Sequence, residues 1–330
     1  MREPWARDDE STKMHHAQLV KCFGHANSKY RAVLRLHATH IAMTSPRVSV
    51  IIATYNRSSV LRYAVASVLN QTMGDFELLV VGDGCTDDSE EVVAGMNDPR
   101  VRWINLPANT GHQSGPNSRG LQEARGEFVA YLGHDDLWLK HHLECMIGKL
   151  EETGAAFAHS LLIRILAAGD ECGMPVYPQP QYGFGGPPSC TVHLRSVADK
   201  IGGWNDYRNL VIPPETDFFN RARAAGFTAV FVPRLTVIKF PGSSRKNVYR
   251  DKPSHEQAHW FQRISEPDFE VEHLVRVVQA LHRELASETP MRKLVRIFAL
   301  EFAGRLRGKL SRFFLYEGKE IDAIKKFKGL

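Results

Sequence analysis

Polar and acidic side chains follow the ends of three apolar runs, VSVIIA, ELLVV and FVAYL. The residues in these positions are Thr54, Tyr55, Asn56, Asp83, Asp135 and Asp136. If the runs are parallel strands, their carboxyl ends meet at one edge of a sheet, which is where open α/β sheets bind ligands. The spacing therefore predicts a polar ligand site built from three separate parts of the chain.

The elements that must position these side chains alternate between strand and helix. Short, β-branched apolar runs of this kind form strands buried on both faces, and we expect them at 48–53, 77–81, 101–104 and 128–132. Helical patterns fall between them at 58–70, 90–96 and 121–124, and a polar loop is expected at 107–118. The alternation predicts an α/β fold with a Rossmann-like, doubly wound, mostly parallel sheet.

Composition excludes several classes of protein. The 330 residues are 43% hydrophobic and 24% charged, as in ordinary globular proteins. A net charge of +5 is too small for a dedicated nucleic-acid binder, so no nucleic-acid partner is expected. The five cysteines are widely spaced and form no C-x-x-C pair, which argues against a zinc site or disulfide framework and favours a reducing cytoplasm. No apolar run approaches the length of a bilayer-spanning helix.

Six segments together resemble the family 2 glycosyltransferases, which have the GT-A fold and transfer sugars with inversion. The matching segments are VSVIIATYN, SVLNQT, FELLVVGDGCTDDS, NTG, ARGEFVAYLGHDDLW and GGW, in this order between Val48 and Trp204. The order and spacing carry the resemblance, because each segment alone could occur by chance. The resemblance extends over about residues 47 to 225.

The resemblance implies a metal site at the end of the fourth strand. Asp135 and Asp136 match the end of the family's aspartate-rich motif, although Gly133 stands where its first aspartate is commonly found. A divalent cation, Mn²⁺ or Mg²⁺, held there would stabilise the departing nucleoside diphosphate. Asp135 is the expected metal ligand, and Asp136 is expected to ligate, to hydrogen-bond a metal-bound water or to contact the donor sugar. Alternatively, the pair only caps a helix that starts near Leu137.

The resemblance also implies a nucleotide-sugar site. Asp83 matches the family aspartate that accepts a hydrogen bond from the base, with Gly82 in place of the preceding aspartate. The turn Thr54-Tyr55-Asn56 would line the same pocket. Arg119 is a candidate for contact with the diphosphate or, equally, a surface residue. Trp204, in the Gly202-Gly203-Trp204 turn, would lie near the donor sugar or in the core.

A carboxylate in the segment PPETDFFNR is expected to act as the base. Direct transfer of a sugar to a hydroxyl needs a proton acceptor opposite the leaving group. Counting back from Arg221, Glu215 falls where the family has the aspartate that acts as the base. Pro214 stands where the family has the glutamate before that aspartate. Asp217 is the alternative base, or else a residue that stabilises the first turn of a helix.

The ends of the chain are expected to lie outside the catalytic domain. We expect a disordered extension over 1–45, a glycosyltransferase domain over 46–270, with nucleotide-binding and acceptor-side halves divided near 140, and a helical basic region over 271–330. Eleven basic and four acidic residues follow position 290, a net charge of +7, beside apolar residues that recur every four positions. The stretch 290–315 would lie on an anionic membrane surface or pack on the catalytic domain.

These features together predict a cytoplasmic enzyme, peripheral on the inner face of the membrane. It would transfer one sugar from a nucleotide-diphosphate sugar to a glycan or lipid-linked acceptor. The Q-x-x-R-W motif of processive synthases is missing, which favours single addition. Because Gly82, Gly133 and Pro214 replace acidic family positions, a non-catalytic sugar-nucleotide-binding or glycan-binding descendant is the alternative. A sugar-phosphate nucleotidyltransferase is disfavoured, because TYNRSS is not a glycine-rich phosphate loop.

Overall fold

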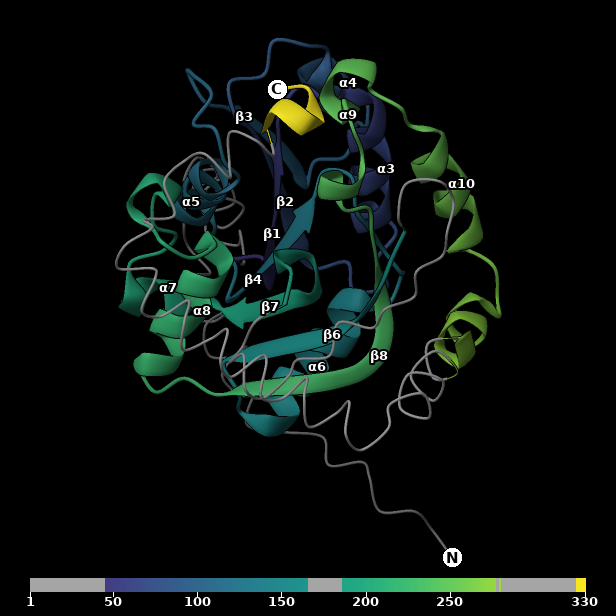
Figure 1. The fold of residues 1–330 in the computed structure, drawn as a ribbon. Coiled ribbons are helices and arrows are strands. Elements are labelled where there is room, and N and C mark those ends of the chain that lie inside the picture. The colour runs from purple at the N-terminus through teal and green to yellow at the C-terminus, as the bar shows by residue number, and fades with distance from the viewer. Residues whose placement is uncertain (1–44, 166–185, 277–278, 280–324) are drawn as a thin grey trace, which may run out of the picture. The chain divides into compact units, whose positions relative to one another are not determined.

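The structure is a computed structural model that describes residues 45–165, 186–276, 279 and 325–330 (Figure 1). The chain divides into two units, Met1–Ser45 and Pro46–Leu330, and the fold below is that of the second. The N-terminal extension and most of the basic stretch after position 271, including 290–315, lie outside the described residues.

An eight-stranded sheet forms the centre of the domain, in the order β3-β2-β1-β4-β7-β6-β8-β5. Its first half is parallel and matches the four expected strands: β1 (Val48–Thr54), β2 (Phe76–Gly82), β3 (Val101–Asn105) and β4 (Phe128–Gly133). Its second half contains β5 (Leu137–Trp138), β6 (Phe157–Arg164), β7 (Thr191–Leu194) and β8 (Ala229–Lys239). Strand β7 runs antiparallel to both of its neighbours, and β5 runs antiparallel to β8. The other four strand pairs are parallel, so the sheet is mostly parallel, as predicted.

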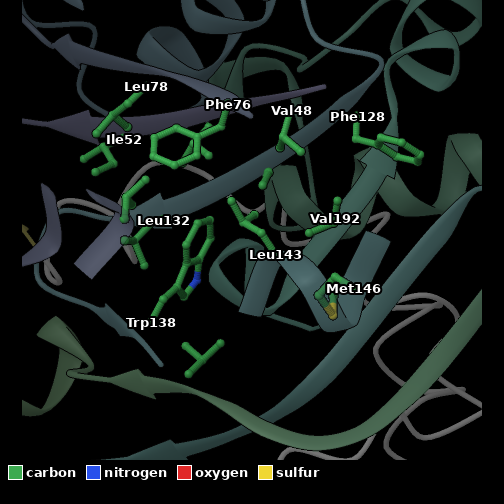
Figure 2. Packing of buried hydrophobic residues seen from close by; sticks show 14 of the residues in the cluster. Val48, Ile52, Phe76, Leu78, Phe128, Leu132, Trp138, Leu143, Met146 and Val192 are labelled. Carbon is green, nitrogen blue, oxygen red and sulfur yellow. The ribbon is translucent and has the colours of Figure 1, made fainter. Parts of the chain in front are cut away.

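Helices cover the sheet on both sides (Figure 1). Their bounds are α3 (Ser58–Leu69), α4 (Ser89–Ala94), α5 (Ser114–Glu123), α6 (His142–Thr153), α7 (Arg195–Ile201), α8 (Pro214–Ala224), α9 (Val248–Asp251) and α10 (His255–Arg263). Alternate residues of each central strand serve opposite faces. Val50 and Ile52 join a core cluster with α3 and α6, part of which is drawn in Figure 2, whereas Ile51 joins a second cluster with α7 and α8. Burial on both faces explains why the central strands are apolar without interruption.

The prediction of a loop over 107–118 is wrong for its second half, because α5 begins at Ser114. The first turn of this helix contains Gly115 and Pro116, and proline is tolerated in the first turn of a helix. Gly115 is needed there because a Cβ atom would collide with the side chain of Thr110. Close contact between the helix start and the preceding loop therefore overrides the local propensity.

Candidate active site

The carboxyl ends of β1, β2 and β4 meet at one edge of the sheet. Thr54 pairs with Gly82, and Ala53 pairs with Gly133. The residues that follow each strand are therefore brought together. Two cavities lie over this edge, with volumes of 530 Å³ and 810 Å³. They share His112, His134 and Tyr249 in their walls, so the two cavities are adjacent, and together they are called the cleft.

The smaller cavity contains the residues predicted to hold the nucleoside. Its wall includes Thr54, Tyr55, Asn56 and Asp83. Asp83 Oδ1 accepts hydrogen bonds from the backbone nitrogen and the hydroxyl of Thr110, at 2.9 and 2.8 Å. No described contact uses Oδ2 of Asp83, which leaves this oxygen for a ligand. The buried hydroxyl of Thr54 has no partner among the described residues, so it too can bind a ligand.

The turn after β1 is held in shape by a left-handed residue. Asn56 has φ +46°, a conformation that asparagine adopts more readily than most residues. Its side-chain oxygen accepts hydrogen bonds from the backbone nitrogens of Thr86 and Asp87, at 2.8 and 3.2 Å. Asn56 therefore joins the turn after β1 to the turn after β2, and these contacts hold part of the wall of the smaller cavity in place.

Gly82 leaves no room for the family's first aspartate. A Cβ atom there would lie 2.6 Å from Oδ1 of Asn105 and 2.8 Å from the ring of Trp103. Asn105 bonds both backbone groups of Cys85, each at 2.9 Å. Where the family has a carboxylate at position 82, this chain has Trp103 and Asn105 packed against Gly82, and the contacts of Asn105 order the loop after β2.

The two aspartates after β4 have different surroundings. Asp135 lies in the wall of the larger cavity. Burial opposes its ionisation, but His134, Lys239, Arg57 and Lys328 outweigh burial, so the pKa of Asp135 is lowered. Asp135 is therefore an anion at neutral pH, as a cation ligand must be.

Asp136 is fully buried and its oxygens are already used. It accepts hydrogen bonds from Ser189 Oγ at 2.5 Å, Lys239 Nζ at 2.8 Å and the backbone nitrogen of Phe240 at 3.0 Å. These contacts join the loop after β4 to the end of β8. They give Asp136 a positioning role. Asp136 is outside the residues that line the two cavities, and the direct ligand contact expected from the sequence stays a prediction.

The side chains of the described residues suit a divalent cation only if the substrate supplies some of its ligands. No cluster of three or more His, Cys, Asp or Glu side chains suited to a metal occurs among the described residues. A Cβ atom at Gly133 would lie 2.7 Å from Oδ2 of Asp136, so an aspartate does not fit there. Mg²⁺ is commonly held by one or two carboxylates together with substrate phosphates. Asp135 is suited to that arrangement.

Glu215 and Asp217 differ in what they face, although both lie in the first turn of α8. Glu215 lies in the wall of the larger cavity, and burial raises its pKa. Asp217 Oδ2 instead accepts hydrogen bonds from Arg221 Nε at 2.8 Å and Asn205 Nδ2 at 3.0 Å. Asp217 is outside the residues that line the two cavities.

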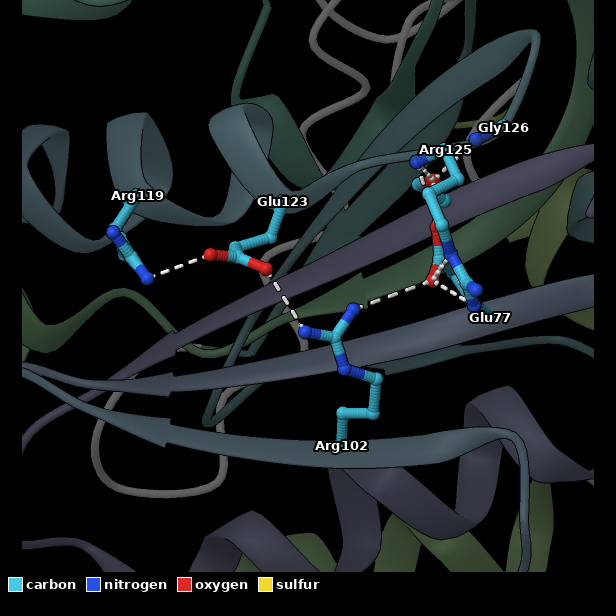
Figure 3. Close-up of polar contacts among 7 residues, drawn as sticks. Glu77, Arg102, Arg119, Glu123, Arg125 and Gly126 are labelled. Atoms are coloured by element: carbon cyan, nitrogen blue, oxygen red, sulfur yellow. Dashed lines mark hydrogen bonds and ion pairs between the residues drawn. The ribbon is translucent and has the colours of Figure 1, made fainter. Parts of the chain in front are cut away.

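The structure does not bring Arg119 to the cleft. Arg119 lies on α5, and its guanidinium is 2.6 Å from Glu123, which also pairs with Arg102 (Figure 3). The network continues through Glu77 and Arg125. Arg119 therefore forms part of a surface ion-pair network, the second of the two roles considered from the sequence.

Trp204 lies in the core between β4 and α8. Its indole nitrogen donates to the Tyr131 hydroxyl at 3.0 Å, and its ring stacks on Phe218 with centroids 5.0 Å apart. Trp204 lines a separate cavity of 170 Å³ and is outside the walls of the two larger ones. Its contacts support the core role rather than contact with the sugar.

Several groups in the cleft had no signal in the sequence. Tyr249 is positioned by Arg57, which is buried, donates to the carbonyl of Val248 at 2.7 Å and lies 5.5 Å from the Tyr249 ring centre. His134 packs edge-on against the same ring, at 6.0 Å. Lys239 ends β8, far along the chain from every recognised motif. His134 lies within the segment ARGEFVAYLGHDDLW and Arg57 directly follows VSVIIATYN, so only these two residues could have been suspected from the sequence.

Comparison with known proteins identifies the class. Residues 49–182 match the family model described as glycosyl transferase family 2. The chain is similar to the Staphylococcus aureus protein TarS in its complex with UDP-GlcNAc, with a TM-score of 0.53 and 16% identity over 84% of this chain and 83% of that one. At this identity the likeness shows the fold, which is GT-A. Over residues 49–182 the chain is therefore similar to the family 2 glycosyltransferases, and its fold is the GT-A fold.

Curated relatives match over a shorter part of the chain. A Campylobacter jejuni protein named GalNAc(5)-diNAcBac-PP-undecaprenol beta-1,3-glucosyltransferase is 35% identical over 119 residues, 34% of this chain and 37% of that one. An Escherichia coli protein named UDP-Glc:alpha-D-GlcNAc-diphosphoundecaprenol beta-1,3-glucosyltransferase is 30% identical over 112 residues, 34% of this chain and 44% of that one. An uncharacterized glycosyltransferase of Rickettsia bellii is 36% identical, but the match spans 17% of its length. The chain thus covers less than half of the length of each of these relatives.

Proposed function

We propose that the protein transfers one sugar from a nucleotide-diphosphate sugar to a hydroxyl of a lipid-linked glycan, with inversion. One observation carries the proposal: of two adjacent cavities over the sheet edge, one has Asp83 in its wall, and the other has Asp135 and Glu215. This order suits a nucleoside, a diphosphate and an acceptor hydroxyl lying in succession. The printed names of the relatives support a lipid-linked acceptor.

Each retained acid has one task in this mechanism. Asp83 accepts a hydrogen bond from the base, and Asp135 would hold a divalent cation, Mn²⁺ or Mg²⁺, together with the diphosphate. The cation would stabilise the negative charge of the leaving group. Glu215 takes the proton of the acceptor hydroxyl as that oxygen bonds to the anomeric carbon and the nucleoside diphosphate leaves. Asp217 is the less suitable base, because Arg221 and Asn205 already bind its carboxylate.

The test measures release of nucleoside diphosphate from UDP-, GDP- and dTDP-sugars, with Mg²⁺ or Mn²⁺ and an extract of lipid-linked glycans. Removal of a general base costs roughly 10²-fold or more in rate, so Glu215→Gln should lose transfer and keep donor binding. Asp135→Asn should lose the part of donor binding that depends on the cation. Exposed Asp199 provides the matched control, because Asp199→Asn removes one carboxylate away from the cleft.

Three outcomes would contradict parts of the proposal. Donor binding without any transfer would favour a non-catalytic sugar-nucleotide-binding protein. Loss of transfer in Asp217→Asn together with normal transfer in Glu215→Gln would move the base by two residues. Cation-dependent binding that survives Asp135→Asn would remove Asp135 from the cation site.

We also propose that the basic stretch 290–315 binds the anionic inner face of the membrane, where such acceptors lie. No helix in the described part of the chain is long and apolar enough to cross a bilayer. Basic residues near an anionic surface contribute about 1 kcal/mol each. Replacing Arg305, Arg307 and Lys309 by glutamine should weaken co-sedimentation with vesicles of anionic lipid at low salt. Equal co-sedimentation of this variant and the wild type would sink the membrane role.

A further inference from the structure

The last residues of the chain, Lys325–Leu330, lie against the candidate site. They form a short helical turn, which is drawn in yellow beside α9 in Figure 1. Asn247 donates a backbone hydrogen bond to the carbonyl of Phe327 at 2.7 Å. Gly329 has φ +84°, and a Cβ atom there would lie 3.2 Å from the Cα atom of Asn247. Backbone contact and close packing thus hold this turn, hereafter the C-terminal turn, on the loop before α9.

The C-terminal turn lines both cavities of the cleft. Lys325 and Leu330 border the smaller and the larger cavity, Gly329 the smaller and Lys328 the larger. Lys325 Nζ lies 3.4 Å from the Tyr207 hydroxyl and 5.4 Å from the centre of that ring. Within the described part of the chain, neither Lys325 nor Lys328 has an ion-pair partner.

The charges around the cleft show why these lysines matter. Asp136 neutralises Lys239 at 2.8 Å, so this pair leaves no net charge for a ligand. Burial lowers the pKa of Lys328, while Asp135 acts in the opposite direction. Burial lowers the pKa of His112 to about 4, helped by Lys328 and Lys325. Two lysines that form no ion pair in the described part of the chain thus line the same cavity as Asp135, and Lys328 interacts with Asp135 electrostatically.

We infer that Lys325 and Lys328 bind the diphosphate of the donor, so that the C-terminal turn is a donor-binding element of this chain. The inference rests on the proposed function, because it needs a nucleoside-diphosphate ligand in the cleft. A diphosphate carries concentrated negative charge, for which lysine ammonium groups are suitable donors. The turn lies outside residues 49–182 of the family match, so its contribution belongs to the part of the chain beyond the shared motifs.

The experiment compares Lys328→Gln and Lys325→Gln with Lys326→Gln. Lys326 is exposed in the same turn, so its substitution removes the same charge without reaching the cleft. Isothermal titration with UDP, GDP and dTDP, each with Mg²⁺ and with EDTA, identifies the nucleotide that wild type binds. The corresponding nucleoside, which has no phosphate, is titrated in parallel. Thermal melts establish that each variant is folded.

We expect Lys328→Gln and Lys325→Gln each to weaken diphosphate binding about 10-fold or more, the size of a charge-assisted hydrogen bond. Nucleoside binding should change less than about 2-fold in all variants, and Lys326→Gln should bind like wild type. Lys328→Arg keeps the charge and should retain most of the affinity.

Two results would overturn the inference while leaving the proposed function intact. Unchanged diphosphate affinity in both glutamine variants would remove the lysines from the site. Tighter diphosphate binding in Lys328→Gln would show that this ammonium competes with the ligand or its cation for Asp135. If wild type binds none of the three nucleoside diphosphates, the proposed function fails and the inference fails with it.

Discussion

Asp136 offers a sharp test of the roles assigned to the two neighbouring aspartates. Asp136→Asn removes the anion that faces Lys239 Nζ at 2.8 Å and weakens the contacts with Ser189 and the backbone of Phe240. Breaking a buried ion pair by removing one partner costs about 3–5 kcal/mol. The side chain of Lys239 is 24% exposed, so water offsets part of this cost. We therefore expect the free energy of unfolding to fall by about 3 kcal/mol.

The assay is urea unfolding followed by tryptophan fluorescence. Trp138 is buried and its indole nitrogen donates to the carbonyl of Ser189 at 2.7 Å, so this ring reports on the region around Asp136. The loss corresponds to a melting temperature lower by about 6–12 °C in a domain of this size. Asp135→Asn should lose less than about 1 kcal/mol, because its carboxylate faces the cavity.

A second substitution separates the ion pair from other effects of the mutation. Lys239→Met in the Asp136→Asn background removes the unpaired ammonium, so the double variant should regain about 1–2 kcal/mol relative to Asp136→Asn. A free energy of unfolding in Asp136→Asn within about 1 kcal/mol of wild type would refute the reasoning. So would normal stability combined with loss of donor binding, because that result would make Asp136 a ligand residue.

Three further predictions concern the core and the base. Gly82→Asp should lower the free energy of unfolding by about 1–3 kcal/mol in a thermal melt, because its Cβ atom would lie 2.6 Å from Asn105. Burial lowers the pKa of His193 to about 4, so the unfolded state binds more protons between that value and 6.5. Stability should fall as the pH drops from 6.5 to 5, by about 2 kcal/mol from this residue, and His193→Gln should flatten that slope in urea titrations. Burial raises the pKa of Glu215, so the acid limb of kcat/KM should lie above the ordinary pKa of glutamate.

The first half of the fold could be predicted from sequence because its strands carry one uniform signal. The segments 48–53, 77–81, 101–104 and 128–132 are short apolar runs, and burial of the parallel strands on both faces keeps them so. The second half was not predicted in this detail. β8 runs for 11 residues from Ala229 to Lys239 with exposed and buried positions in an irregular order, so it shows neither a continuous apolar run nor strict alternation.

The site could be predicted where its residues adjoin a strand end or, like Glu215, fall in a recognised segment of the chain. Thr54, Asp83 and Asp135 follow β1, β2 and β4, and the register of a parallel sheet brings them together. Tyr249 and Lys328 reach the cleft through contacts between segments far apart in the chain, for which local patterns give no signal. Trp204 shows the opposite case. It lies in a recognised motif, Gly202-Gly203-Trp204, but its side chain packs in the core instead of the cleft.

The acidic positions that this chain lacks bear on the choice between an enzyme and a non-catalytic descendant. At position 82 the space is filled by Trp103 and Asn105, and at position 133 it is limited by Asp136, so both glycines are required by their neighbours. Pro214 begins α8, where proline is favoured, and Glu215 follows it into the cavity wall. Each replacement thus has a local structural reason, while Asp83, Asp135 and Glu215 all remain in the cleft. Loss of function would leave no reason for these three carboxylates to share one cavity system, and their placement therefore favours the enzyme.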